Sequence, residues 1–353
     1  MFRLEPRPVP SRWLAMASPF LALAVTVLVG TLLFALLGKD PVQGLRVFFW
    51  EPIRSAYAWS ELSVKATPLV LIALGLAVCF RANLWNIGAE GQFIMGAIFA
   101  GWVAMKATPE SGATLLVGVL AAGALGGAVW GGVVAWLRQS FNTNEILVSL
   151  MLVYVAEMVL SYLVYGPWKD PNGYNFPQTI TFLEAARVPR LVQGFRANMG
   201  LLLAGGAVIG FMVFLYRTYA GFQLQVGGLA PAAARYAGFS SARALWTGML
   251  LSGAMAGLAG ALDVAGPQGQ LTPYVPMGYG FAAIIVAFVG RLNPVGIVLS
   301  AVLMSMFYIG GELAQSRLGL PKALTGVFQG LLLFSLLACD TFIHQRLRWG
   351  RAS

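Results

Sequence analysis

Long uninterrupted runs of apolar residues are the feature that most constrains this chain. They recur in blocks of about 20 residues, the length that an α-helix needs to cross about 30 Å of hydrocarbon. Of the 353 residues, 58% are hydrophobic and 10% are charged, whereas soluble domains carry about 25% charged residues. These charges are too few to cover a soluble surface, so we expect an all-α polytopic protein surrounded by a lipid bilayer.

Ten apolar blocks predict about ten transmembrane helices. The first block is too long for a cleaved signal peptide, so we interpret it as an uncleaved span. The eighth is too short to cross a bilayer as a simple helix, so we expect it to be broken or extended by its flanks. The predicted spans are 14–37, 61–80, 91–107, 113–137, 145–165, 198–216, 244–263, 279–290, 295–312 and 322–340.

The short turns between spans predict the orientation. Arg81, Arg138 and Arg291 each occupy a tight turn, and short cytoplasmic loops are the loops most enriched in Lys and Arg. With an even number of spans, we expect both the N and the C terminus in the cytoplasm. The formal net charge is +10, but the basic residues are scattered singly between apolar blocks. They form no patch that would bind nucleic acid.

The spacing of the blocks leaves no room for a soluble domain. We expect a single transmembrane domain over 1–353, made of a first span with an external segment (1–60) and a core (61–343). Within that core, segment 166–197 is rich in Pro and Gly and is expected to be an ordered external loop with turns. Segment 217–243 is expected to be the longest cytoplasmic loop.

Glycines inside the predicted spans indicate close packing of helices. Gly123 and Gly127 lie in the fourth span, and Gly253, Gly257 and Gly260 lie in the seventh. Small residues at such spacing let helix backbones approach one another in a membrane. This pattern predicts a tight bundle and says nothing about transport.

A polar segment joins the second and third apolar blocks. Two Asn, one Glu and one Gln lie there within ten residues, interleaved with apolar side chains. An exposed turn is one explanation, since Asn and Gly favour turns, but it leaves the apolar residues without a role. Irregular backbone within a membrane is tolerated against protein or a water-lined cavity, so we predict a broken helix that enters the bundle. The candidate gate residues are Asn83, Trp85, Asn86, Glu90 and Gln92.

A second polar stretch precedes the fifth span. Thr143 or Asn144 is placed to cap that helix, and Glu145 lies in its first turn, where the helix dipole favours a carboxylate. Glu157 lies near the middle of the span and Asp263 near the external end of the seventh. An ionisable residue within a membrane is costly unless it faces the bundle interior or a cavity. Asn144, Glu145 and Glu157 are therefore candidate pathway residues, with hydrogen bonds between helices as the alternative explanation.

The cytoplasmic loop predicts a short helix. Pro231 suits the first turn of a helix, the alanine-rich run 232–237 favours helix, and Gly238 suits the position after its end. A helix of about two turns is unstable alone, so it docks either on a partner or on its own bundle. The candidate docking residues are Gly228, Pro231, Ala234, Arg235, Tyr236 and Gly238.

Motifs for catalysis are missing from the sequence. It contains no G-x-x-x-x-G-K-[ST] loop, no G-x-S-x-G elbow and no H-E-x-x-H pair. His344 is the only histidine, which excludes a site with several histidine ligands. We expect a chain that is not an enzyme and that carries no catalytic residues, no cofactor and no metal site.

Three parts of the sequence give the chain a resemblance to a known family. Asn83–Gln92, Phe141–Glu145, and Ala233–Gly238 followed by Ser252–Ala261 are similar to segments of the permease subunits of bacterial ABC importers for nucleosides and simple sugars. These belong to the larger family of the ribose and branched-chain amino acid permeases. The resemblance covers about 60–340, nearly the whole chain.

The resemblance implies a multi-pass protein of the bacterial inner membrane that imports a nucleoside or a related sugar-containing solute. It implies a second, homologous permease subunit, two cytoplasmic ATPase subunits that hold ATP and Mg, and an extracytoplasmic solute-binding protein. The loop around 228–238 is then the coupling helix that responds to the ATPases. Two positions depart from the family: Ala230 stands where Asn is common, and Gln225 stands where Arg is common.

The main hypothesis is therefore a permease whose solute passes between spans 2–5 and 7–10, beside the candidate gate residues. Trp85 and Phe281 would offer aromatic faces to a base or a sugar. One alternative is an ion-coupled secondary transporter that uses Glu157 or Asp263 as a proton site. A second, more distant alternative is a membrane enzyme that acts on a lipid or lipid-linked substrate.

Overall fold

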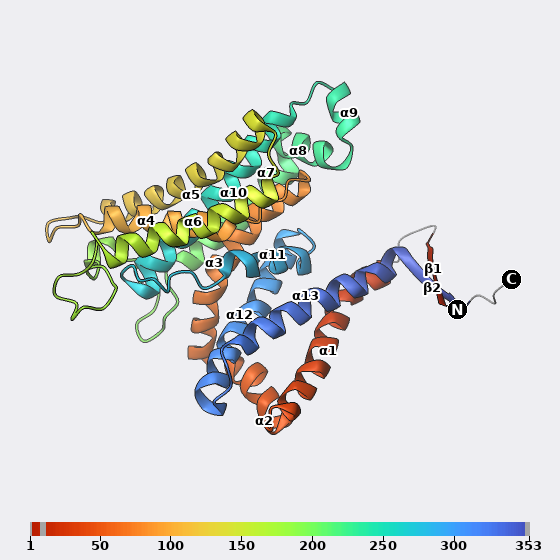
Figure 1. Ribbon diagram of the computed structural model, residues 1–353, viewed down its shortest axis with the longest axis horizontal. Coiled ribbons are helices and arrows are strands. Elements are labelled where there is room, and N and C mark those ends of the chain that lie inside the picture. The colour runs from red at the N-terminus through yellow and green to blue at the C-terminus, as the bar shows by residue number, and fades with distance from the viewer. Residues whose placement is uncertain (1, 8–11, 350–353) are drawn as a thin grey trace. The chain divides into compact units, whose positions relative to one another are not determined.

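The computed structural model describes residues 2–7 and 12–349, which are mostly helical (Figure 1). The helices in chain order are α1 (Arg12–Leu36), α2 (Pro41–Leu45), α3 (Ala56–Arg81), α4 (Ala89–Ala104), α5 (Thr114–Phe141), α6 (Glu145–Tyr165), α7 (Gly200–Arg217), α8 (Tyr219–Leu229), α9 (Pro231–Tyr236), α10 (Ser241–Asp263), α11 (Tyr279–Val289), α12 (Pro294–Leu318) and α13 (Ala323–His344). Short π or 3-10 turns are η1 (Arg46–Trp50), η2 (Glu51–Ile53), η3 (Glu184–Ala186) and η4 (Val264–Gln268), and the strands are β1 (Phe2–Pro6) and β2 (Gln345–Trp349).

Each of the ten predicted spans corresponds to a helix. Within the described ranges, eight helices are long and apolar enough to cross a membrane. The other two are shorter, since α4 has 16 residues and α11 has 11. The backbone of Gly278 is left-handed (φ 77°) directly before α11, so the eighth span is a short helix that its flanks do not extend. The prediction of an all-α polytopic fold with broken helices is confirmed.

The chain forms two compact units. One is 60–302, and the other combines the residues up to 59 with those from 303 onward. Within 60–302, α4, α5, α6 and α10 run side by side (Figure 1). Glycines allow this packing: a Cβ on Gly257 would lie 2.2 Å from the carbonyl oxygen of Gly123, and a Cβ on Gly96 would lie 2.2 Å from the Cα of Gly257. No larger residue fits there, which confirms the predicted close approach of the backbones.

The segment 166–197 is ordered by hydrogen bonds to the chain that follows α10. The N–H of Phe182 donates to the carbonyl of Gly269, and the N–H of Val188 donates to the carbonyl of Ala265, both at 2.8 Å. These bonds satisfy backbone groups that would otherwise need water. The predicted ordered loop with turns is confirmed.

The segment 217–243 contains two helices where one was predicted. α9 matches the prediction, with Pro231 at its first position and Gly238 in a left-handed conformation (φ 79°) after its end. α8 was missed because three of its eleven residues are glycine, which disfavours a helix. Packing overcomes that preference, because a Cβ on Gly228 would lie only 2.1 Å from the carbonyl oxygen of Arg81.

The two ends of the chain form the second unit. α1 packs along α13, and the Ser18 hydroxyl donates to the Asp340 carboxylate at 2.7 Å. Segment 38–60, predicted only as an external segment, is folded into α2, η1, η2 and the start of α3. A buried aromatic cluster holds this unit together, and the ring centroids of its stacked Phe48 and Phe328 lie 4.3 Å apart. Its members are Phe34, Phe48, Phe307 and Phe328.

β1 and β2 pair in antiparallel fashion, with Phe2 opposite Trp349. The segments that precede α1 and follow α13 therefore lie together. Both described ends of the chain must then be on the same side of the membrane, as an even number of spans requires. Their cytoplasmic location stays a prediction.

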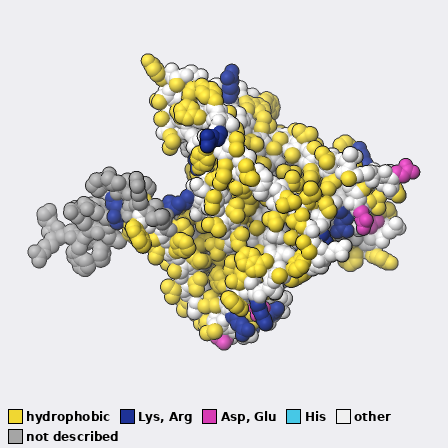
Figure 2. All heavy atoms as spheres, turned by 180° about the vertical axis from the view of Figure 1, so that it is seen from behind, with side chains coloured by type: hydrophobic (Ala, Val, Ile, Leu, Met, Phe, Trp, Pro, Cys, Tyr) yellow, Lys and Arg dark blue, Asp and Glu magenta, His cyan; other side chains and the backbone are white. Residues whose placement is uncertain are grey.

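The surface is that of a protein surrounded by apolar neighbours. Figure 2 shows a face covered mostly by hydrophobic side chains, with Lys and Arg in a few separate places. Large hydrophobic side chains are exposed along α1, α5, α6 and α7, such as Phe20, Val117, Met158 and Ile209. Apolar surface of this extent suits contact with lipid or with another membrane subunit.

Candidate functional site

The chain between α3 and α4 is not helical and lies deep in the 60–302 unit. Asn83 lies two residues after the end of α3 in a left-handed conformation (φ 56°), with its side chain exposed. Asn86 is fully buried, and its amide nitrogen donates to Gln92 Oε1 at 2.9 Å and to Ser252 Oγ at 3.0 Å. Its Oδ1 accepts from the N–H of Gly88 at 3.1 Å. The polar groups thus satisfy one another inside the bundle, as the predicted broken helix requires.

Glu90 connects this break to the start of α11. Its carboxylate is 1% exposed and accepts from the N–H of Gly278 at 2.9 Å and of Gly280 at 2.5 Å. A helix N-terminus carries partial positive charge and unpaired N–H groups, so a carboxylate is a suitable partner. A Cβ on Gly280 would lie 2.2 Å from the backbone nitrogen of Glu90, so the two helices meet closely. α11 therefore begins inside the bundle, at the start of α4.

Further ionisable side chains lie near this junction. Glu157 and Asp263 interact electrostatically with Glu90. Asp263 is buried, accepts a hydrogen bond from Gln268 and interacts with Lys65 of α3. Sequence reasoning did not single out Lys65, although a lysine just inside the predicted span 61–80 was a visible signal. The Glu157 side chain is partly exposed on α6.

Two aromatic side chains predicted to face solute are partly exposed. Trp85 and Phe281 are each 40% exposed. The Trp85 ring packs against Phe80 of α3, with centroids 5.4 Å apart, and against Phe288 of α11 at 6.1 Å. Trp85 therefore fills the space between the break and α11 with part of its surface and leaves the rest open.

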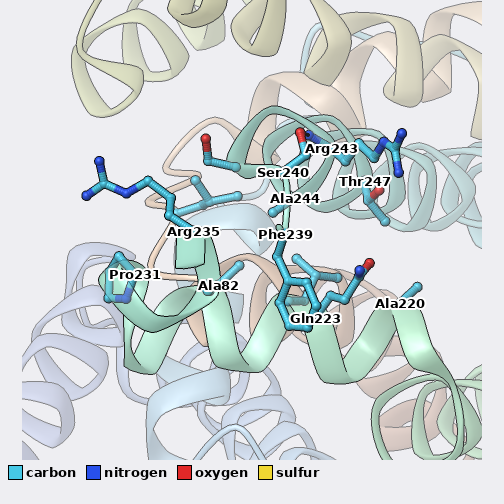
Figure 3. Close-up of a pocket in the computed structure, with 15 residues that line it drawn as sticks. Ala82, Ala220, Gln223, Pro231, Arg235, Phe239, Ser240, Arg243, Ala244 and Thr247 are labelled. Carbon is cyan, nitrogen blue, oxygen red and sulfur yellow. Dashed lines mark hydrogen bonds between the residues drawn. The ribbon is translucent and has the colours of Figure 1, made fainter. Parts of the chain in front are cut away.

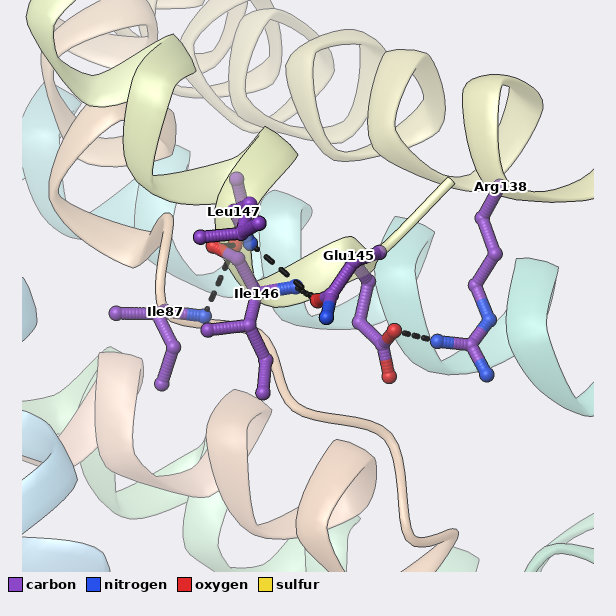
Figure 4. A network of polar contacts seen from close by, with 7 residues as sticks. Ile87, Arg138, Glu145, Ile146 and Leu147 are labelled. Atoms are coloured by element: carbon purple, nitrogen blue, oxygen red, sulfur yellow. Dashed lines mark hydrogen bonds and ion pairs between the residues drawn. The ribbon is translucent and has the colours of Figure 1, made fainter. Parts of the chain in front are cut away.

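α6 is attached to the break at its first turns (Figure 4). The N–H of Ile87 donates to Ser149 Oγ at 3.3 Å. Asn144 caps α6, because its Oδ1 accepts from the N–H groups of Ile146 at 2.9 Å and Leu147 at 3.4 Å. The side chain of Asn144 is thus used by its own helix, which is the capping role that the sequence also predicted.

Glu145, in the first turn of α6, pairs with Arg138 near the end of α5 (Figure 4). The Glu145 side chain is almost buried. Its role in the structure is to hold the connection between these two helices. It makes no hydrogen bond with Asn86 or Glu90 among the contacts of the described residues.

The six predicted docking residues lie together on α8, α9 and the turn after them. Ala234 is buried, whereas Tyr236 is 98% exposed. Behind α9 lies a pocket of about 140 Å³ between α8, α9 and the start of α10, lined in part by Pro231, Arg235 and Arg243 (Figure 3). The short helix thus rests on its own bundle through Ala234 and leaves the Tyr236 side chain exposed.

Short helices that meet inside a membrane bundle at buried polar groups are the architecture of a membrane transport protein. The chain belongs to the family described as branched-chain amino acid transport system / permease component, whose model matches residues 59–337. That range agrees with the extent of the resemblance found in the sequence. No solved structure matches the chain.

Curated relatives narrow the class further. The chain is 36% identical to the glucose ABC transporter permease protein TsgB13 of Haloferax volcanii, over 98% of this chain and 93% of that protein. It is 27% identical to the nucleoside ABC transporter permease protein NupB of Lactococcus lactis, over 90% and 89%. NupC of the same organism, also a nucleoside ABC transporter permease protein, is 24% identical over 72% and 83%.

The chain is therefore an ABC transporter permease of the nucleoside and sugar type, a multi-pass protein of the cell membrane. The predicted family and location are confirmed. Membership of this class is consistent with a translocation subunit that is not an enzyme.

Proposed function

We propose that this chain is the membrane-spanning subunit of an importer that moves a neutral, sugar-containing solute, a simple sugar or a nucleoside, into the cytoplasm. ATP is hydrolysed on partner subunits, which hold the nucleotide and Mg. The relatives carry glucose or nucleosides by name, and these solutes share a polyhydroxylated ring.

The position of Glu90 carries the choice of a neutral solute. Helix N-termini inside transporters are suited to the anionic group of a substrate. Here two N–H groups at the N-terminus of α11, those of Gly278 and Gly280, already have the Glu90 carboxylate as their acceptor. An amino-acid carboxylate would find this position occupied, whereas a sugar ring needs none of it. This observation favours sugars and nucleosides over the branched-chain amino acids for which the family is named.

The remaining residues of the site suit such a solute. The exposed parts of Trp85 and Phe281 offer aromatic faces to a base or to the apolar face of a sugar, whereas Asn86 is buried and holds the break in place through its bonds to Gln92 and Ser252. In this proposal, the bundle opens at the junction of the break with α11, and solute passes beside it.

The complex contains more than this chain. Lactococcus lactis has two different permeases that both resemble it, which supports pairing with a second, homologous permease subunit. One of two cytoplasmic ATPase subunits would dock on α9, where Tyr236 is exposed, and the other would dock on the second permease. An extracytoplasmic binding protein would deliver the solute to the outer side.

The test is reconstitution of this chain in liposomes with an ABC ATPase, a second permease of this family and a solute-binding protein from the same organism. Labelled glucose, guanosine and leucine are offered separately. We expect uptake of glucose or guanosine that needs both ATP and the binding protein, and no uptake of leucine. Uptake of leucine alone, or uptake by the isolated chain driven by a proton gradient, would contradict the proposal.

A further inference from the structure

Arg81, the last residue of α3, joins three parts of the 60–302 unit. Its Nε and Nη2 donate to the carbonyl oxygen of Leu292 at 3.2 and 2.9 Å. Its Nη1 donates to Gln225 Oε1 at 2.9 Å. Nη2 also reaches the hydroxyl of Tyr216 at 3.4 Å, and the guanidinium lies 5.8 Å from the centre of that ring. One side chain therefore contacts α7, α8 and the turn after α11.

Two of the residues that Arg81 contacts connect it to the docking segment α8–α9 and to α11, the two parts of the proposed mechanism that must move together. Gln225 lies in α8, directly before the docking helix α9. Leu292 lies in the turn after α11 and is itself left-handed (φ 54°). A guanidinium has five N–H donors in a rigid planar fork, so it can hold the carbonyl and the amide at once. A lysine ammonium has no such fixed geometry.

Gln225 is held so that it can only accept from Arg81. Its Nε2 donates to the carbonyls of Leu215 at 2.9 Å and Gly221 at 3.3 Å, which leaves Oε1 for the guanidinium. Beside this contact, Gly228 packs directly on the backbone of Arg81. α8 is therefore attached to the end of α3 by a side-chain bond and by close backbone packing.

We propose that Arg81 is the positioning residue through which movement of α8 and α9 reaches α11; this rests on the proposed function. The Leu292 carbonyl transmits the movement to the C-terminal end of α11. The chain that follows Arg81 is the break, which leads to Glu90 and so to the N-terminal end of the same helix. A shift of α8 thus acts on both ends of α11 through one residue.

The experiment uses the reconstituted complex and compares solute imported per ATP hydrolysed. The variants are Arg81→Gln, Gln225→Ala and the exchange Arg81→Gln with Gln225→Arg. Arg217→Gln is the matched control, because Arg217 is likewise the last residue of a helix but makes none of these contacts. Co-purification of the ATPase measures assembly. We expect both single variants to assemble. Each should import at least about fivefold less solute per ATP, because a factor of about five is the lower end of ordinary allosteric coupling.

The exchange variant distinguishes a loss of coupling from a general destabilisation of the protein. It returns a guanidinium and an amide to the two sides of the same contact, so we expect it to recover part of the ratio lost by Arg81→Gln. Gln225→Ala leaves the bond to Leu292 intact and so decides the matter if Arg81→Gln does not assemble.

Unchanged import per ATP in Gln225→Ala and Arg81→Gln, with a working parent complex, would overturn the proposal for Arg81 and leave the proposed function standing. A parent complex without any ATP-driven uptake would overturn the proposed function, and the role of Arg81 with it.

Discussion

Arg138 and Glu145 form an ion pair across the short connection between α5 and α6 (Figure 4). Arg138 lies near the C-terminus of one helix and Glu145 at the N-terminus of the next, so each charge also complements the dipole of its own helix. The pair fixes the first turns of α6, whose Ser149 receives the hydrogen bond from the break at Ile87.

Arg138→Gln is expected to destabilise the protein, because it leaves the nearly buried Glu145 carboxylate without its partner. The loss should be about 1–3 kcal/mol, between the values for exposed and fully buried pairs. Thermal unfolding of the purified protein in detergent measures it, with Arg243→Gln, an exposed arginine, as the control. Exchanging the two residues should recover only part of the loss, because each charge then opposes a helix dipole. An unaltered unfolding temperature for Arg138→Gln would contradict this role.

Glu90→Gln should slow uptake. The glutamine retains the size of the side chain, but its amide nitrogen cannot accept, so one N–H at the start of α11 loses its partner. A hydrogen bond to a charged group contributes about 1.5–3 kcal/mol, so we expect initial uptake rates about tenfold lower. Rates are normalised to assembled complex, and Glu110→Gln, on an exposed turn, is the control. Equal rates for Glu90→Gln and the control would show that the cap has no part in transport.

Gly257→Ala should destabilise the bundle, because the added methyl group would lie 2.2 Å from the carbonyl oxygen of Gly123. Overpacking of this kind costs about 1–3 kcal/mol. Gly206→Ala in α7 is the matched control, since nothing lies within 4 Å of its added Cβ. The measurement is the unfolding temperature in detergent, which should fall only for Gly257→Ala. A similar change in both variants would argue against backbone packing at this position.

Tyr236→Ala should weaken coupling to the ATPase without altering stability. Tyr236 is 98% exposed, so its removal costs the isolated chain little, whereas a docked partner would lose an aromatic contact. We expect less ATPase to co-purify, or less solute to be imported per ATP, at an unchanged unfolding temperature. Tyr174→Ala is the control, because Tyr174 is 93% exposed on the other predicted side of the membrane. Coupling that is equally affected in both variants would remove α9 as the docking helix.

Local features of this protein could be predicted from its sequence. Apolar length located the spans, polar residues between apolar ones located the break at Asn86, and Pro231 with Gly238 bounded α9. Each of these depends on residues close together in the chain. The glycine pattern at Gly257 likewise predicted close packing, though it did not name the partner at Gly123.

Contacts between distant segments were not predictable. Glu90 accepts from the N–H of Gly280 in the first turn of α11, 190 positions later in the chain, and Arg81 binds a carbonyl 211 positions away. Helical periodicity gives the face of each helix but not which helices are neighbours. α8 was missed for a related reason, because its glycines disfavour a helix until the end of α3 packs against them.

Side chains bind α11 at both of its ends, and this affects how the helix can move. The helix is about 16 Å long at 1.5 Å per residue, and Glu90 binds at one end while Arg81 binds at the turn beyond the other. If the hydrogen bonds at one end are released, α11 would rotate about its other end instead of sliding along its axis. A small displacement close to that end would then be larger at the free end. In the proposed coupling, a small movement of the cytoplasmic side at Leu292 would therefore give a larger displacement of the N-terminal end of α11, inside the bundle.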